Sequence, residues 1–178
     1  ASREVEGTSV LLNAKTIRSR LSGLGRGIFP VWATHLTAAI DVHKEILYWS
    51  VVAWCAGFSG SIIDYGTWPD QHRAYFAQND PPHPISEFIR DGSDENKIEQ
   101  ALRILTDGLL SKAWTREGGG ESKIEKCPTD SGYETNSIFA FCRSSPHSSV
   151  LIPSKGIGVN AKQIPWDEHK KVTGERRG

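Results

Sequence analysis

Three strand-like runs follow one another in the first half of the chain, and they constrain its fold more than any other feature. Residues 36–42 (LTAAIDV) are mostly apolar, 46–54 (ILYWSVVAW) are aromatic and β-branched, and 61–65 (SIIDY) stop before a glycine. Residues of these kinds are enriched in strands. The turns between the runs, at 43–45 and 56–60, are short. Because short turns join antiparallel neighbours, the sequence predicts an antiparallel three-strand meander.

The second half of the chain shows helix and strand signals in alternation. A loop is expected over 67–93, which contains four prolines. Ser93 or Asp94 can cap a helix over 95–114, where apolar residues recur at helical spacing and predict one buried face. Residues 122–130 then read as a strand that ends in a carboxylate. This order places a helix directly after the meander and a new strand after the helix.

A second helix and a last strand complete the predicted order. The helix begins near Thr135 or Asn136 and ends at Arg143, and residues 149–152 (SVLI) form the strand. The sum is β-β-β-α-β-α-β. This order predicts an α/β fold of the RNase H-like class, with a mixed sheet (an antiparallel three-strand meander followed by α-β-α-β) and flanking helices.

The chain divides into three parts. Residues 1–30 are expected to form an N-terminal helix and linker, 31–165 the RNase H-like domain, and 166–178 a polar tail that stops before the natural end of the domain. A length of 178 residues suits one domain with short extensions. The helix of the linker is expected over 8–23. Its apolar side consists of Val10, Leu11, Ile17 and Leu21.

Composition limits the possible partners. No apolar run approaches the roughly 18 residues that cross a bilayer, so no membrane partner is expected. Net charge is zero, so a nucleic-acid partner would have to meet a local basic cluster. The three cysteines are widely spaced, which is typical of a reducing compartment. A zinc site made of Cys127, Cys142 and His147 is disfavoured, because the chain has no CxxC pair.

Two carboxylates are the best candidates for chemistry. Asp41 ends the first apolar run and Asp130 ends the later one. In an RNase H-like sheet these two strands lie side by side, so the carboxylates would converge. Two such charges about 4 Å apart repel by about 4 kcal/mol at an effective dielectric near 20. Divalent cations remove that repulsion, and Mg²⁺ prefers oxygen ligands. For each residue a role in a local turn stays open, and for Asp64, a third candidate, the turn is the favoured interpretation.

A series of motifs then resembles a known family. The series runs in order and spacing over roughly residues 15–165. It is similar to the nuclease domain of the large terminase subunit of lambda-like phages and prophages (the GpA family). The motifs are Leu36–Val42, Leu47-Tyr-Trp, Ile63-Asp-Tyr-Gly66, Cys127-Pro-Thr-Asp-Ser-Gly-Tyr133, Ile138–Arg143 and Pro153-Ser-Lys-Gly156.

The resemblance implies a DNA-packaging enzyme of the bacterial host's cytoplasm. The family has an N-terminal ATPase and a C-terminal endonuclease that cuts concatemeric double-stranded viral DNA. Its partners are the terminase small subunit and the portal of the procapsid. By this resemblance, Asp41 and Asp130 correspond to the family's catalytic residues and to its ligands of Mg²⁺ or Mn²⁺. Asp64 is a further candidate ligand. Two ions about 4 Å apart suit phosphodiester hydrolysis. Lys155 and Arg143 are candidate DNA contacts.

The chain departs from the family pattern at several points. It has no GxxxxGK[ST] phosphate loop, so no ATP site is expected. Pro128 stands where a strand residue is expected. The family's third acidic ligand lies well beyond the second, and only Asp167 and Glu168 could replace it here. Two alternatives therefore stay open: a catalytically inactive prophage remnant or DNA- or portal-docking module, and another RNase H-like enzyme such as a recombinase.

Overall fold

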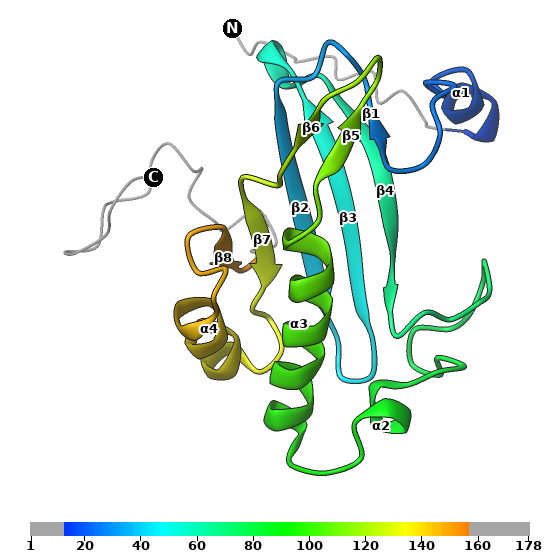
Figure 1. Ribbon diagram of the computed structural model, residues 1–178. Coiled ribbons are helices and arrows are strands. Elements are labelled where there is room, and N and C mark those ends of the chain that lie inside the picture. The colour runs from blue at the N-terminus through cyan, green and yellow to red at the C-terminus, as the bar shows by residue number, and fades with distance from the viewer. Residues whose placement is uncertain (1–12, 157–178) are drawn as a thin grey trace, which may run out of the picture.

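The structure, a computed structural model, describes residues 13–156 of the chain. In this part an α/β fold holds four α-helices, one 3-10 helix and eight strands in two sheets (Figure 1). The helices are α1 (Ala14–Arg18), α2 (Ile85–Phe88), α3 (Asp94–Leu110) and α4 (Thr135–Ser144), with the 3-10 helix η1 at Ala56–Phe58. The strands are β1 (Ile28–Phe29), β2 (His35–Val42), β3 (Leu47–Trp54), β4 (Gly60–Trp68), β5 (Trp114–Arg116), β6 (Glu121–Ser122), β7 (Cys127–Asp130) and β8 (Leu151–Ser154).

The larger sheet has five strands in the order β4-β3-β2-β7-β8. β2 pairs with β3, and β3 with β4, in antiparallel fashion. β7 joins the other edge of β2 in parallel, and β8 pairs with β7 in parallel. The three predicted runs correspond to β2, β3 and β4, which form the antiparallel part of a mixed sheet. The order along the chain, in which a helix precedes β7 and another precedes β8, is as the sequence predicted.

β4 is longer than the sequence predicted. It continues through Gly66 to Trp68, although a glycine was expected to end it. Gly66 stays in the strand because it is the register partner of Trp49, whose indole lies against it. A bulge between Val51 and Val52 shifts the register of the β3–β4 pair.

The expected strand over 122–130 is two strands in different sheets. Only β7 belongs to the main sheet, while β6 pairs with β5 and β5 pairs with β1 in a small second sheet. Gly118, Gly119 and Gly120 form the turn between β5 and β6 with positive φ angles. Pro128 lies inside β7, where it contributes no N–H to the ladder.

α3 lies across one face of the main sheet and supplies much of the core (Figure 1). Ser93 caps it, with its side-chain oxygen accepting from the amide of Asn96, and Leu102, Leu105 and Leu109 are buried as predicted. The helix ends four residues earlier than expected, at Leu110 rather than 114, because Trp114 begins β5.

The two smaller helices that the sequence predicted, α4 and α1, agree with their predicted bounds to different degrees. α4 matches its predicted bounds within a residue, and Ile138, Phe141 and Cys142 are buried. The N-terminal helix was expected over 8–23. Residues 1–12 lie outside the described part, and α1 ends at Arg18, five residues before the predicted end. Two residues of its expected apolar side, Ile17 and Leu21, are 56% and 72% exposed.

Candidate active site

Asp41 and Asp130 occupy matching places on neighbouring parallel strands. Ile40 on β2 is in register with Thr129 on β7, so the next residue of each strand is one of the two aspartates. Ile40 and Thr129 are buried, whereas the Asp41 side chain is 58% exposed and Asp130 is partly exposed. Because side chains alternate along a strand, both carboxylates lie on the face opposite the buried pair. Their backbones are about 4.8 Å apart, the usual spacing of paired strands.

A histidine and an amide surround Asp41. Nε2 of His43, just past the end of β2, lies 3.1 Å from Oδ2 of Asp41. The side-chain nitrogen of Gln78 in turn lies 2.6 Å from Nδ1 of His43. Neither His43 nor Gln78 was expected at the site from the sequence. The spacing Asp-x-His at a strand end could have indicated the first, since residues two apart in a strand share a face.

A tight turn holds Asp130 at the end of β7. The amide of Gly132 donates to Oδ2 of Asp130 over 3.2 Å. The next residue, Ser131, is fully buried and donates from both its amide (2.7 Å) and its hydroxyl (3.0 Å) to the carbonyl of Ser154. The backbone after Asp130 is therefore fixed to β8. Asp130 accepts a hydrogen bond within a local turn, as considered from the sequence, and it also lies on the strand next to Asp41.

A second group of side chains connects three elements at the same end of the sheet. Nζ of Lys44 lies 2.9 Å from Oδ2 of Asp94, the first residue of α3, and the Tyr133 hydroxyl donates to that oxygen over 3.5 Å. The hydrogen bond from Lys44 lowers the pKa of Asp94, and the same bond raises the pKa of Lys44. Burial raises the pKa of Tyr133, with Asp94 adding to the effect. The group links the β2–β3 turn, α3 and the loop after β7.

The other residues predicted for the site lie elsewhere. Asp64 is buried within β4, two strands from β2, and its carboxylate accepts from Nε of Arg26. It therefore pairs with an arginine and does not join Asp41 and Asp130. Lys155 is exposed and directly follows Ser154, the register partner of Asp130. Arg143 is exposed in the last turn of α4, at the far end of that helix from the loop after β7.

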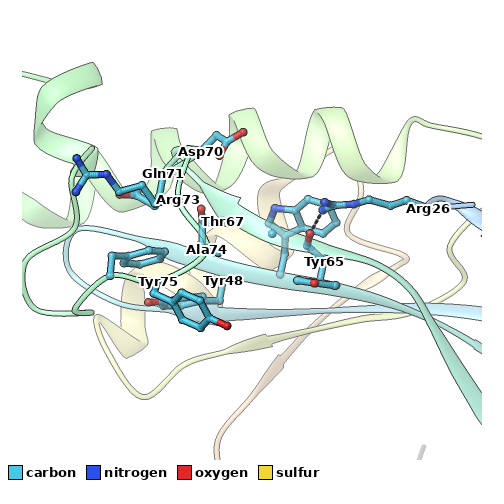
Figure 2. A pocket seen from close by; sticks show the side chains of 12 residues that line it. Arg26, Tyr48, Tyr65, Thr67, Asp70, Gln71, Arg73, Ala74 and Tyr75 are labelled. Carbon is cyan, nitrogen blue, oxygen red and sulfur yellow. Dashed lines mark hydrogen bonds between the residues drawn. The ribbon is translucent and has the colours of Figure 1, made fainter. Parts of the chain in front are cut away.

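A cavity of 640 Å³ opens between β3, β4 and the loop over 70–76 (Figure 2). Its lining is rich in aromatic rings and carries two arginines. The residues with side chains in its wall include Arg26, Tyr48, Tyr65, Thr67, Asp70, Gln71, Arg73, Tyr75 and Phe76. Tyr48 is the register partner of Asp41, so it borders both the cavity and this carboxylate. Burial raises the pKa of Tyr48, and the charge of Asp41 adds to this. The 67–93 segment was expected to be a loop, and its part in this cavity was not predicted.

Within residues 13–156, no three His, Cys, Asp or Glu side chains gather into a group that could hold a metal ion. Cys127, Cys142 and His147 therefore do not form a zinc cage in this part. Asp41 and Asp130 still fit Mg²⁺ or Mn²⁺ as a pair of hard oxygen ligands. Asp167 and Glu168, considered as a third ligand, lie outside the described residues.

No helix among those described is long and apolar enough to cross a membrane.

Solved structures give no usable guide to function. Two of those similar to this chain come from Aquifex aeolicus: one is described as its PPX-GPPA enzyme, the other as its member of the Ppx/GppA protein family. They share 11% and 12% identity and TM-scores of 0.35 and 0.33, each over 68% of this chain. The match spans only 36% and 35% of those chains. Likeness at this level carries no argument.

The family comparison is decisive for membership. No curated protein sequence matches the chain. The family model described as terminase large subunit gpA, endonuclease domain, however, matches residues 4–178, which is nearly the whole sequence. The resemblance seen in the motifs around Asp41 and Asp130 is thereby confirmed at the level of the family. The chain belongs to the endonuclease-domain family of the gpA terminase large subunit.

Proposed function

We propose that this domain cuts double-stranded DNA by metal-dependent hydrolysis of a phosphodiester, with Asp41 and Asp130 as the catalytic carboxylates. The observation that carries the proposal is their register: the two aspartates follow the Ile40–Thr129 pair on adjacent parallel strands, on one face of the sheet. Membership in the terminase endonuclease family supports the class of reaction. The place of the carboxylates supports the choice of residues.

We also infer that the fold is RNase H-like. The central strand β2 carries an antiparallel partner on one side and the parallel strand β7 on the other. Along the chain, the strands of the main sheet come in the order β2, β3, β4, then β7 after α3 and β8 after α4, and this order supports the same class. In that fold the first strand and a later parallel strand present carboxylates side by side, which matches the placement of Asp41 and Asp130.

The chemistry follows from the charges at the site. Two neighbouring carboxylates would repel a phosphodiester, so cations must mediate the contact. Mg²⁺ or Mn²⁺, when bound, would activate water and stabilise the leaving oxygen. Asp41 and Asp130 would hold these ions through oxygen, and the contact from His43 would fix the orientation of the Asp41 carboxylate. Lys155, exposed beside the Asp130 edge, could contact a DNA phosphate.

The biological setting is proposed from the family. A gpA endonuclease domain implies viral DNA as substrate and DNA packaging as process. We infer that the target is concatemeric phage DNA in the cytoplasm of the host. The terminase small subunit and the portal would act as partners of the full-length protein. The alternative is a domain that docks DNA or the portal without cutting.

A plasmid-nicking assay with Mg²⁺ or Mn²⁺ tests the proposal. The wild-type domain is expected to nick or linearise the plasmid, and Asp41→Asn and Asp130→Asn are each expected to lower the rate at least about a hundredfold. Asp107→Asn is a matched control, because Asp107 is an exposed aspartate on α3 that contacts His147. Cleavage that survives in both site variants would refute the assignment. DNA binding without cleavage by the wild type would favour the docking alternative.

A further inference from the structure

The cavity between β3, β4 and the loop over 70–76 has a lining that suits a nucleobase. Tyr75 is 93% exposed, so its ring is open to a ligand, and Tyr65, which is 65% exposed, adds a second ring to the lining. Exposed aromatic rings beside cationic side chains are the usual platform on which proteins stack the bases of unpaired nucleic acid. A volume of 640 Å³ falls within the range of about 300–1,000 Å³ that small-ligand sites occupy. Thr67 and Asp70 add hydrogen-bonding groups to the wall.

The wall of the cavity is held in place before any ligand binds. Gln71 is 1% exposed, and its side chain donates to the carbonyls of Pro69 (2.8 Å) and His83 (2.7 Å). It also accepts from the amide of His83 over 2.9 Å, so both ends of the loop are joined through one buried amide. Phe76 from this loop stacks on Tyr48 of β3, with ring centroids 6.2 Å apart and planes 7° apart. A preformed site of this kind loses little entropy when a ligand enters.

The charges in the wall leave one arginine available. Arg26 is paired with Asp64, donates to the carbonyl of Tyr65 and lies over the Tyr65 ring. Asp70 accepts from the amide of His72. Arg73 is exposed and forms no ion pair or hydrogen bond with another of the described side chains. A phosphate attached to a stacked base would therefore find a free guanidinium at the rim.

A single row of residues connects the cavity to the carboxylates. Asp41 on β2 is the register partner of Tyr48 on β3, and Tyr48 is the register partner of Thr67 on β4. On the other side of β2, Asp130 directly follows Thr129, the register partner of Ile40. Paired strands are about 4.8 Å apart, so Thr67 is about 10 Å from Asp41. That is about three nucleotides at the 3.4 Å rise of a DNA strand. A strand cut at the aspartates would therefore pass the mouth of the cavity.

From these observations we propose that the cavity binds an unpaired nucleotide of the DNA substrate, with its base against Tyr75 and its phosphate at Arg73. The inference rests on the proposed function, since it places this nucleotide beside the cut. A fully paired duplex does not present base faces, because they are stacked inside it. The domain would thus prefer DNA that is locally unpaired or opened near the cleavage site.

Fluorescence anisotropy in EDTA tests binding without cleavage. The probes are a labelled short duplex and the same duplex with a central bulge of unpaired nucleotides. The wild type is expected to bind the bulged duplex about tenfold more tightly than the paired one. Tyr75→Ala and Arg73→Gln are each expected to remove most of this preference while changing affinity for the paired duplex less than about twofold. Phe58→Ala is the control, because Phe58 is 94% exposed and lies in η1, outside the cavity wall.

A fluorescent base analogue in the bulge gives a second reading. Its emission is expected to be quenched by the wild type through stacking and to stay unquenched with Tyr75→Ala. Equal wild-type affinity for both duplexes, or an equal loss on both for Tyr75→Ala, would overturn the inference. Cleavage is scored separately, so an intact nuclease without the binding preference refutes only the cavity. A base-selective cavity in a domain that never cuts would refute only the nuclease.

Discussion

The indole of Trp49 lies across Gly66 on the neighbouring strand, so closely that a Cβ at position 66 would meet Cζ2 of the ring at 2.9 Å. The two residues are register partners in β3 and β4 and both line the cavity. Gly66→Ala is therefore expected to displace the ring and to lower the free energy of unfolding by about 1–3 kcal/mol, the usual cost of overpacking. Urea unfolding measures this loss.

A helix glycine provides the control for this substitution. Gly108 lies within α3, and a Cβ there would meet nothing within 4 Å. Gly108→Ala is expected to stabilise the domain by about 0.5–1 kcal/mol, because alanine is the better helix former. If Gly66→Ala were as stable as the wild type, the indole could move away freely and would not be a fixed wall of the cavity.

A buried leucine tests the packing of α3 on the sheet. Leu105 is 7% exposed, and Leu105→Ala is expected to cost about 2–5 kcal/mol of unfolding free energy through lost contacts and a residual cavity. The adjacent Ile104 is 51% exposed, so Ile104→Ala should cost less than about 1 kcal/mol. Chemical denaturation of the two variants gives the comparison. Similar losses for both would show that the helix face is assigned incorrectly.

The strands and helices with strong local patterns could be predicted from the sequence. The bounds of β2 and β3 match within a residue, and α3 begins as predicted at its Ser93 cap. The patterns failed where a distant partner decides the structure. Gly66 continues β4, where it pairs with Trp49, and residues 121–122 pair with β5 outside the main sheet.

The two aspartates of the candidate site could be predicted from the sequence, but the contacts around them could not. Strand ends identified Asp41 and Asp130, and their register in the sheet is the kind of neighbourhood that the fold class implied. The contacts of His43 with Asp41 and Gln78 depend on a loop whose path no local pattern describes. The cavity likewise needs Gln71 to join two loop segments that are 12 residues apart. Local periodicity carries no information about such contacts.

Removing one of the two carboxylates should separate stability from metal binding. Asp130→Asn keeps an oxygen that can accept from Gly132, and it removes one of two neighbouring negative charges. In EDTA the variant is expected to be as stable as the wild type, or more stable by up to about 1 kcal/mol. Millimolar Mg²⁺ should raise the melting temperature of the wild type but not of the variant. An equal response of both proteins to Mg²⁺ would contradict the assignment of Asp130 as a ligand.

The contact between Lys44 and Asp94 predicts a defined pH dependence. The pKa of Asp94 is lowered from 3.8, so the pair stabilises the fold above about pH 4 and loses this effect as acid protonates Asp94. The pKa of Lys44 is raised from 10.5, so the effect is present below that pH and disappears as Lys44 deprotonates above it. Lys44→Met should therefore flatten the acid side of the stability profile.

Denaturant midpoints at about pH 7 and pH 3 measure this difference. Both side chains are largely solvent-exposed, so the effect should be small and should shrink further in high salt. Arg103→Met is the comparison, because Arg103 forms an exposed i,i+4 pair with Glu99 on α3, away from the site. If the profiles of Lys44→Met and the wild type coincide between these two pH values, the contact does not contribute in solution.

The three cysteines are expected to differ sharply in reactivity. Cys127 is completely buried, and burial raises the pKa of its thiol to about 12, so almost no thiolate exists at neutral pH. Cys142 is also buried and burial raises its pKa, whereas Cys55 is partly exposed. A thiol-specific reagent should therefore label one cysteine quickly in the native domain and the other two only after unfolding. Cys55→Ser should abolish the fast phase and leave the slow one unchanged. Rapid labelling of Cys127 in the native state would show that the β7–β8 region opens readily. Such opening would be incompatible with a rigid placement of Asp130 at the end of β7.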